Sequence, residues 1–353
     1  MIYRMLVYLL SFLVALTGGL IANLLDLPIP WLLGSLLAVS FCSLKGLPIR
    51  SASFSRKIGL MIIGISLGLY FTPDMIDLLS QHFYLMLAVA IFSISLGIIG
   101  SIITFKLSKV SYKTAWFASV IGGASEMSNL AQFHRARVDQ VVASHSLRVF
   151  LVVTIVPFFY TFMGYHGDDG NSIDLNQTIS LIGLIILFAL STAGAKIFEL
   201  MNWSNPWTFA PLIVAAGLTS FDIHLSSIPP ILSYLGQVCI GWTLGTKFQP
   251  NFFKTAPRLL LATAVCVMVH LILTVIVSLS LASWTGVNVA ILGLGFSPGG
   301  VAEMTITAKT LQLGVPFVTM LHVIRMIAVI STAGILYRYL SKLRFTKDQL
   351  IDD

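Results

Sequence analysis

The sequence has few charged residues. Only 10% of its 353 residues are charged, whereas 57% are hydrophobic. A soluble domain carries about 25% charged residues, which cover its water-facing surface. Length alone would suggest roughly two or three soluble domains, but so few charges cannot cover their surface. The composition therefore excludes a soluble globular protein and predicts a polytopic membrane protein.

Cysteines and metal-binding motifs are also scarce. The three cysteines, Cys42, Cys239 and Cys266, each lie in an apolar run, and none has a Cys-x-x-Cys spacing. A disulfide scaffold and a thiolate metal cluster are therefore disfavoured. The chain has no HExxH, P-loop or GxSxG motif, and its histidines are scattered. We expect neither a catalytic site nor a metal or other cofactor.

What the chain does have is two sets of apolar runs. The first set covers residues 5–25, 29–45, 58–72, 83–106, 115–131 and 141–163, and the second covers 178–199, 206–220, 234–248, 259–284, 288–308 and 316–340. Most are long enough to cross a bilayer core, which takes about 20 helical residues. The third and fifth runs of each set are short or interrupted by glycine. The first run is similar to a signal peptide, but it recurs at the start of the second set, so we interpret it as an uncleaved span.

The two sets match residue for residue. At an offset of 177 residues, Gly122-Gly123-x-x-Glu126-Met127 recurs as Gly299-Gly300-x-x-Glu303-Met304, and His145 and Arg148 recur as His322 and Arg325. The chain has three glutamates and two of them align, so chance is a poor explanation. We predict an internal duplication. Its parts are a first membrane repeat at 1–163, an acidic extracytoplasmic linker at 164–177, a second membrane repeat at 178–341 and a cytoplasmic tail at 342–353.

Loop charge predicts that the repeats have opposite orientations. With the N-terminus inside, loops 45–57 and 106–113 are basic and inside, and loop 73–82 is acidic and outside. If the fifth run dips into the membrane and returns, Arg135 and Arg137 stay inside and the acidic linker lies outside, which agrees with the positive-inside rule. Only Lys309 then falls on the wrong side. Each repeat has five crossings and one re-entrant segment, so the repeats are inverted; the alternative is twelve plain spans with parallel halves.

The fifth run of each repeat carries the candidate site. Two adjacent glycines, preceded by proline in the second copy, interrupt a helix, and unpaired backbone at membrane depth survives only against protein, water or ligand. Interrupted helices in inverted repeats indicate a transporter site near the midplane. The amides of the helix that follows favour an anionic or polar group. The predicted substrate- or ion-binding residues are Gly122, Gly123, Ser125, Glu126 and Asn129 in the first copy, and Ser297, Pro298, Gly299, Gly300, Glu303 and Thr305 in the second.

Two interpretations of Glu126 and Glu303 stay open. A carboxylate at membrane depth costs about 2.5–3.5 kcal/mol and is by default a functional candidate. Each glutamate also lies three residues past the second glycine, where it can cap the helix that begins there. The two interpretations are compatible with each other.

Four further residues support the predicted site, namely His145, Arg148, His322 and Arg325. Each histidine lies one turn before its arginine on the same helix face. The arginines either snorkel to the interface, or face the break and bind the glutamates or a substrate anion. The histidines are either proton carriers or buried, neutral, hydrogen-bonded side chains. Glycines four residues apart predict close helix packing at Gly64, Gly68, Gly241 and Gly245.

At these residues the chain resembles the AbrB family of duplicated integral membrane proteins, whose members are often labelled ammonia monooxygenase or AbrB family regulator. The family pattern is Thr-Pro-Gly-Gly-x-x-Glu-Met and His-Ser-Leu-Arg in the first half, and Pro-Gly-Gly-x-x-Glu-Met with a later His and Arg in the second. The likeness covers nearly the whole chain. Val120-Ile121 replaces the family's Thr-Pro, so we expect the two halves to be functionally unequal.

The resemblance implies a protein of the bacterial inner membrane, and a looser kinship with the cation/proton antiporter and anion transporter superfamily. We expect a secondary transporter of a small polar or anionic metabolite, coupled to H⁺ or Na⁺, with both termini cytoplasmic. The alternative is a membrane sensor that affects gene expression indirectly, because no polar stretch is long enough for a DNA-binding module. A monooxygenase is disfavoured. The expected partners are the lipid bilayer and a small-molecule or ion substrate, with no nucleic acid, and a homodimer is compatible with the sequence.

Single-cysteine labelling tests the topology. In a background that lacks the three native cysteines, a cysteine at position 136 should react from the inside and one at 170 from the outside. If the repeats are inverted, positions 74 and 222 should both be outside, and their repeat-equivalents near positions 250 and 45 should be inside. Labelling of 136 from the outside and of 170 from the inside would reject the re-entrant arrangement.

Overall fold

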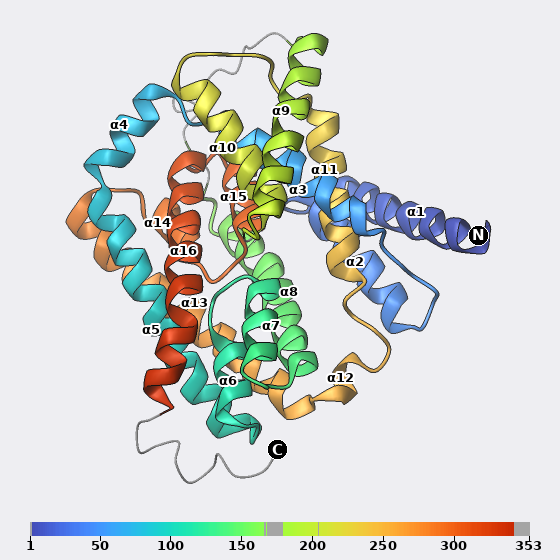
Figure 1. The fold of residues 1–353 in the computed structure, drawn as a ribbon, viewed down its shortest axis with the longest axis vertical. Coiled ribbons are helices and arrows are strands. Elements are labelled where there is room, and N and C mark those ends of the chain that lie inside the picture. Colours follow the sequence, from blue (N-terminus) through green and yellow to red (C-terminus); the bar gives the residue numbers. More distant parts are fainter. Residues whose placement is uncertain (1, 166, 168–178, 204, 342–353) are drawn as a thin grey trace. The chain divides into compact units, whose positions relative to one another are not determined.

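The computed structural model describes residues 2–165, 167, 179–203 and 205–341, and within them all regular structure is helical (Figure 1). Most of the predicted linker and the predicted tail lie outside the described residues. Six helices are long and apolar enough to cross a membrane. These are α1 (Ile2–Leu24), α5 (Phe83–Ser108), α8 (Val138–Phe162), α9 (Leu181–Leu200), α13 (Pro257–Thr285) and α16 (Val315–Leu340). The prediction of a helical protein is therefore confirmed for the described residues, and six of its helices could cross a membrane.

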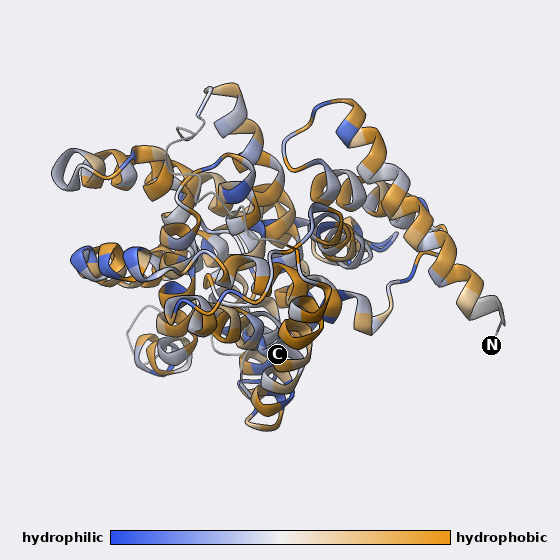
Figure 2. Ribbon diagram, turned by 90° about the horizontal axis from the view of Figure 1, so that it is seen from above, coloured by the Kyte–Doolittle hydropathy of each residue, from blue (hydrophilic) through white to orange (hydrophobic). Residues whose placement is uncertain are grey.

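The outer faces of the long helices are apolar. In α1, Leu9, Leu10 and Ile21 are each at least half exposed, and hydrophobic residues dominate this helix from the N-terminus onward (Figure 2). A soluble protein rarely exposes so many large apolar side chains on one element. The pattern suits a helix with lipid against one side.

The order of helices repeats in the two halves of the chain. Four pairs of equivalent helices have the same number of residues in both halves. They are α2 (Pro30–Leu44) and α10 (Pro206–Ser220), α3 (Ser53–Gly68) and α11 (Pro230–Gly245), α6 (Tyr112–Ser119) and α14 (Val289–Phe296), and α7 (Ala124–Phe133) and α15 (Val301–Thr310). The duplication predicted from the sequence thus has a structural counterpart. The helices from the second and third runs have 15 and 16 residues, so they are shorter than a full span.

The segment 73–82, which the sequence suggested was a loop, is instead mostly helical. Helix α4 (Pro73–Gln81) follows α3 at a bend of 83°. Proline at the first helical position and Asp74 in the first turn both favour a helix start at this point. The other short element is α12 (Phe252–Thr255).

The chain forms two compact units, and each combines segments of both halves. Unit 1 comprises Met1–His82, Pro157–Pro250 and Thr305–Thr319. Unit 2 comprises Phe83–Val156, Asn251–Met304 and Met320–Asp353. Neither unit is a repeat, because the duplicated halves interlock within each of them.

Unit 1 depends on glycines that let helix backbones touch. A Cβ atom at Gly64 of α3 would come within 2.6 Å of the carbonyl oxygen of Thr208 on α10. The equivalent Gly241 of α11 lies in the same way against the carbonyl of Leu32 on α2, at 2.6 Å. One turn later, Gly68 and Gly245 repeat these contacts. The prediction of close helix packing at these glycines is confirmed.

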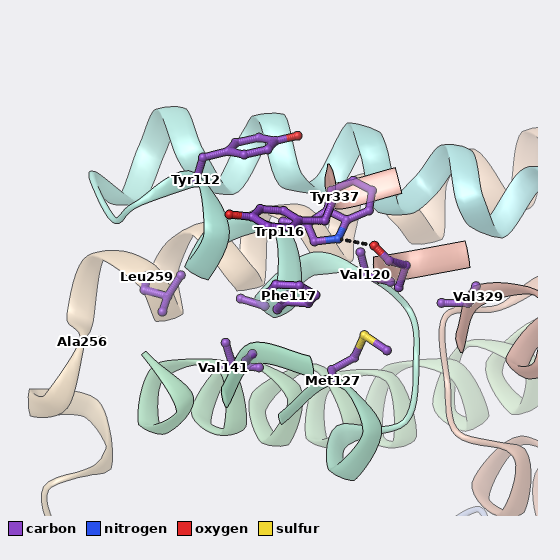
Figure 3. Packing of buried hydrophobic residues seen from close by; sticks show 13 residues of the cluster. Tyr112, Trp116, Phe117, Val120, Met127, Val141, Ala256, Leu259, Val329 and Tyr337 are labelled. Carbon is purple, nitrogen blue, oxygen red and sulfur yellow. Dashed lines mark hydrogen bonds between the residues drawn. The ribbon is translucent and has the colours of Figure 1, made fainter. Parts of the chain in front are cut away.

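Unit 2 has its core around α6. Trp116 and Phe117 are fully buried there together with Met127 of α7 and Val141 of α8 (Figure 3). The Trp116 indole Nε1 donates a hydrogen bond of 3.1 Å to the carbonyl of Ala333 on α16. Short helix α6 is therefore held by both a first-repeat and a second-repeat helix, and this fixes the position of the chain break that follows it.

Replacing Gly241 by Val should destabilise the protein, because the new side chain would force α11 away from α2. Overpacking of this kind costs about 1–3 kcal/mol. The control is Gly217→Ala on α10, where a Cβ atom would meet nothing within 4 Å and where alanine improves helix propensity. Thermal unfolding in detergent should show a lower midpoint for Gly241→Val alone. Equal midpoints for the two variants would contradict the packing role.

Candidate functional site

Each Gly-Gly pair lies between two short helices. The first break separates α6 from α7 at residues 120–123, and the second separates α14 from α15 at residues 297–300. These helices have 8 or 10 residues, so each is about 12–15 Å long. None could cross a bilayer core of about 30 Å by itself. The predicted interruption of the helix is therefore present in both halves.

An arginine holds each break from the following long helix. Arg148 of α8 donates from its two Nη atoms to the carbonyls of Val120 and Gly122, at 3.0 Å each. Arg325 of α16 donates in the same way to the carbonyls of Ser297 and Gly299. The end of a helix leaves carbonyls without backbone partners, and each guanidinium satisfies two of them. The arginines thus face the breaks instead of snorkelling to the interface.

A histidine holds the last turn before each break. His145 Nε2 donates to the carbonyl of Phe117 at 2.8 Å, and His322 Nε2 donates to the carbonyl of Leu294 at 2.9 Å. Both histidines have no exposed surface. A helix would normally satisfy the carbonyl of Leu294 from residue 298, but Pro298 has no N–H group. The geometry matches the interpretation of the histidines as buried hydrogen-bonded side chains.

The first glycine of each break lies against a buried methionine. A Cβ atom at Gly122 would come within 2.6 Å of the Met127 side chain, and one at Gly299 would collide with Met304. Both methionines are fully buried. The first glycine of each pair therefore leaves room for the methionine, so Gly-Gly-x-x-Glu-Met is a packing motif as well as a helix break.

At the second break, the glutamate folds back over the residue that precedes its helix. A Cβ atom at Gly300 would collide with the carboxylate of Glu303, and α15 begins at Val301. Glu303 is therefore the third residue of α15 and lies over the residue before the helix, which is the geometry of a capping box. Position 300 must be glycine for this arrangement. The structure thus agrees with the capping interpretation for Glu303.

The charges of both breaks act on one another within unit 2. Glu303 attracts the guanidinium groups of Arg148 and Arg325, and the two guanidinium groups repel each other. In the part of the chain that the structure describes, these three are the buried charged residues. The structure therefore brings together residues from the two repeats that the sequence placed 177 positions apart.

The two breaks differ in burial. Ser297 and Thr305 are buried at the second break, whereas Ser125 and Asn129 on α7 are exposed and Glu126 is half-buried. Of the predicted residues, Thr305 belongs to the part of α15 that lies in unit 1, and the others lie in unit 2. This difference in burial agrees with the expected inequality of the two halves, which the loss of Thr-Pro from the first copy suggested.

Sequence reasoning missed one buried residue, His270 of α13. Its Nε2 donates to the carbonyl of Leu96 on α5 at 2.9 Å and lies 3.4 Å from the sulfur of Cys266. The equivalent position in the first repeat is Ser93, so a search for repeated residues could not find it. The available signal was a single histidine inside the most apolar candidate span. Within the described residues, no group of three or more His, Cys, Asp or Glu side chains could hold a metal ion.

Replacing Arg148 or Arg325 by Lys should destabilise the protein although the charge remains. An ammonium group cannot reach both carbonyls as a planar guanidinium does, and a hydrogen bond to a charged group contributes about 1.5–3 kcal/mol. We expect the unfolding midpoint in detergent to fall by several degrees. The control is Arg135→Lys, since Arg135 is exposed. If all three variants unfold at one temperature, the arginines do not hold the breaks.

Comparison with known proteins finds a family and two relatives that match most of the chain. The model of the family described as "Transition state regulatory protein AbrB" matches residues 31–341. The chain is 26% identical to "Uncharacterized protein YhjN" of Bacillus subtilis, with 95% of this chain and 93% of that relative covered. It is 21% identical to "Putative regulator AbrB" of Escherichia coli, with 89% and 91% covered. The match extends over both repeats and both Gly-Gly breaks, and the chain therefore belongs to the AbrB family.

Proposed function

We propose that this protein is a secondary transporter of a small polar or anionic metabolite, coupled to H⁺ or Na⁺, with its site at the two Gly-Gly breaks. The observation that carries the proposal is the pair of breaks, each held by its own buried arginine, with Glu303 acting on both guanidinium groups. Irregular backbone at membrane depth is typical of transporter sites. Two buried guanidinium groups near one buried carboxylate favour an anionic group on the substrate.

The transport proposal includes inverted repeats, and the packing of unit 1 supports them. Successive contacts along α3, from Gly64 to Thr208 and from Gly68 to Leu212, advance in the same direction along α10. Helices α3 and α10 therefore run parallel. Helices α2 and α3 are consecutive and joined by the short segment 45–52, so as spans they run in opposite directions. Helix α10 then runs opposite to α2, its equivalent in the first repeat.

Contacts at the helix ends support the same orientation. Lys57 near the start of α3 bonds to Glu199 near the end of α9 at 2.8 Å and lies 4.9 Å from the ring centre of Trp207 at the start of α10. In the reciprocal contact, Trp31 at the start of α2 stacks on Tyr234 of α11 with ring centres 5.2 Å apart. These contacts support a topology in which α3 and α10 start on the same side of the membrane.

This orientation also bears on the broken segment of the first repeat. Between the start of α3 and the start of α10, the chain contains the candidate spans α5, α8 and α9, and the proposal counts α3, with the bent helix α4, as one further crossing. An even number of crossings returns the chain to the side from which it began. If α6 and α7 together made a further crossing, α10 would begin on the opposite side. With α3 counted as a crossing, the contacts support a re-entrant pair of helices.

The second candidate function is a membrane sensor that affects gene expression without turnover. The observation that favours it is the word "regulator" in the name of the Escherichia coli relative. A sensor would use the same breaks to bind a ligand and to shift between two conformations. No catalytic reaction is part of either proposal.

Flux measurements separate the two functions. Small metabolites that raise the unfolding midpoint of the detergent-solubilised protein are first identified. The protein is then placed in proteoliposomes with an imposed H⁺ or Na⁺ gradient. A transporter should accumulate the stabilising metabolite only in the presence of the matching gradient. Binding without flux under every gradient would reject transport and favour the sensor.

Glu303→Gln should abolish gradient-driven flux if the carboxylate carries the coupling ion, and Glu126→Gln should have a smaller effect because its site is half-buried. The protein should still fold, since glutamine can also cap a helix and loss of a cap costs about 1 kcal/mol. Unfolding midpoints of both variants provide the control for folding. Full ion-coupled transport by the double variant would contradict a role of the glutamates in coupling and leave capping as their function.

A further inference from the structure

Lys309 of α15, the one lysine on the wrong side in the topology predicted from loop charge, has defined contacts in unit 1. Its Nζ donates to Ser66 Oγ at 2.7 Å and lies 5.9 Å from the ring centre of Tyr70. Ser66 is 4% exposed, whereas Lys309 and Tyr70 are half-buried. Ser66 is in the last turn of α3 and Tyr70 is in the segment before the 83° bend. The ammonium group is therefore held inside the protein but remains reachable.

The charge of Lys309 has no acidic partner in the described part of the chain. The ion pairs found there involve Lys57, Lys196, Arg137 and His224. A buried charge is costly unless it is paired. An ammonium group has three N–H donors, and the one recorded hydrogen bond of Lys309 uses a neutral hydroxyl group. The C-terminal ends of α3 and α15 favour a cation here, so the group can stay charged while donors remain available.

The first repeat shows that the fold itself does not need this lysine. At the position equivalent to Lys309, helix α7 has Gln132, which is exposed. The positions equivalent to Ser66 and Tyr70 are Thr243 and Lys247. The first repeat therefore forms the equivalent short helix with an uncharged residue at this position. A cation on the broken helix is a property of the second repeat alone.

We propose that Lys309, Ser66 and Tyr70 form a binding site for one oxyanion, either a carboxylate or a phosphate. The ammonium group supplies the charge and two further donors, the Ser66 hydroxyl supplies a polar contact beside it, and the Tyr70 ring borders the ammonium group. A soluble metabolite and a lipid headgroup both present this chemistry. The site lies in unit 1 and requires no turnover, so it goes beyond the transport proposal and does not depend on it.

Anion binding to the purified protein tests the proposal. In detergent, the unfolding midpoint is measured against rising concentrations of sodium succinate or inorganic phosphate, with sodium chloride at equal ionic strength as the reference. In nanodiscs, the midpoint in phosphatidylglycerol is compared with that in phosphatidylcholine. At least one of these oxyanions should stabilise the wild-type protein. Stabilisation by the soluble anions indicates a metabolite site, and stabilisation by phosphatidylglycerol alone indicates a lipid site.

The variants decide whether Lys309 is responsible. Lys309→Gln should weaken the anion effect at least tenfold, Ser66→Ala should weaken it a few-fold, and Lys309→Arg should retain it because the charge remains. The control is Lys247→Gln, which removes an exposed lysine from the position equivalent to Tyr70 and should leave the effect unchanged. Lys309→Arg also shows whether a loss in Lys309→Gln reflects misfolding.

Two results would overturn the inference. One is an anion effect that Lys309→Gln leaves at the wild-type level, and the other is the absence of stabilisation by succinate, phosphate and phosphatidylglycerol alike. Flux in proteoliposomes without any anion binding at Lys309 would reject this site and leave the transport proposal standing. Anion binding lost in Lys309→Gln, together with no flux, would support the site and reject transport.

Discussion

The constraint on which this structure depends is that backbone polar groups inside a membrane must be hydrogen-bonded. A helix that stops at membrane depth leaves carbonyls that water cannot reach, and each would cost several kcal/mol. The protein meets this cost with side chains from the next long helix. Arg148 and Arg325 each bond to two carbonyls at a break, and a histidine one turn earlier bonds to a third. The breaks can therefore be permanent features of the fold.

In unit 1, glycines stabilise the fold by letting helix backbones pack directly against each other. Because Gly64 and Gly241 have no side chain, α3 meets α10, and α11 meets α2, with backbone against backbone. Contacts of this kind replace the hydrophobic driving force that helices lack inside lipid. They also fix the relative direction of helices from different repeats, on which the proposed inverted arrangement rests. Short helices in unit 1 are thus stabilised by partners from the opposite half, whereas each break in unit 2 is held by an arginine and a histidine of its own half.

Duplication supplied the framework, and the differences between the copies indicate where function resides. The arginine and histidine bonds are the same in both copies, so they belong to the framework. Three features occur in the second copy only. Its break is buried, and it has His270 and Lys309 where the first copy has other residues. Features that break the repeat are therefore the better candidates for substrate, ion or lipid recognition in this AbrB family member.

The sequence by itself determined the helical membrane class, the duplication, the position of both breaks and the residues around them. These follow from local patterns, because apolar runs, adjacent glycines and a fixed offset need no knowledge of distant contacts. Tertiary structure decided which way the arginines point. It also placed the carboxylate of Glu303 against position 300, where only glycine leaves room for it. It also decided that Lys309 bonds to Ser66, a residue 243 positions away, and that His270 bonds to α5. Such choices depend on which distant helix lies opposite, since a buried donor bonds to whichever carbonyl or hydroxyl oxygen the packing brings to it.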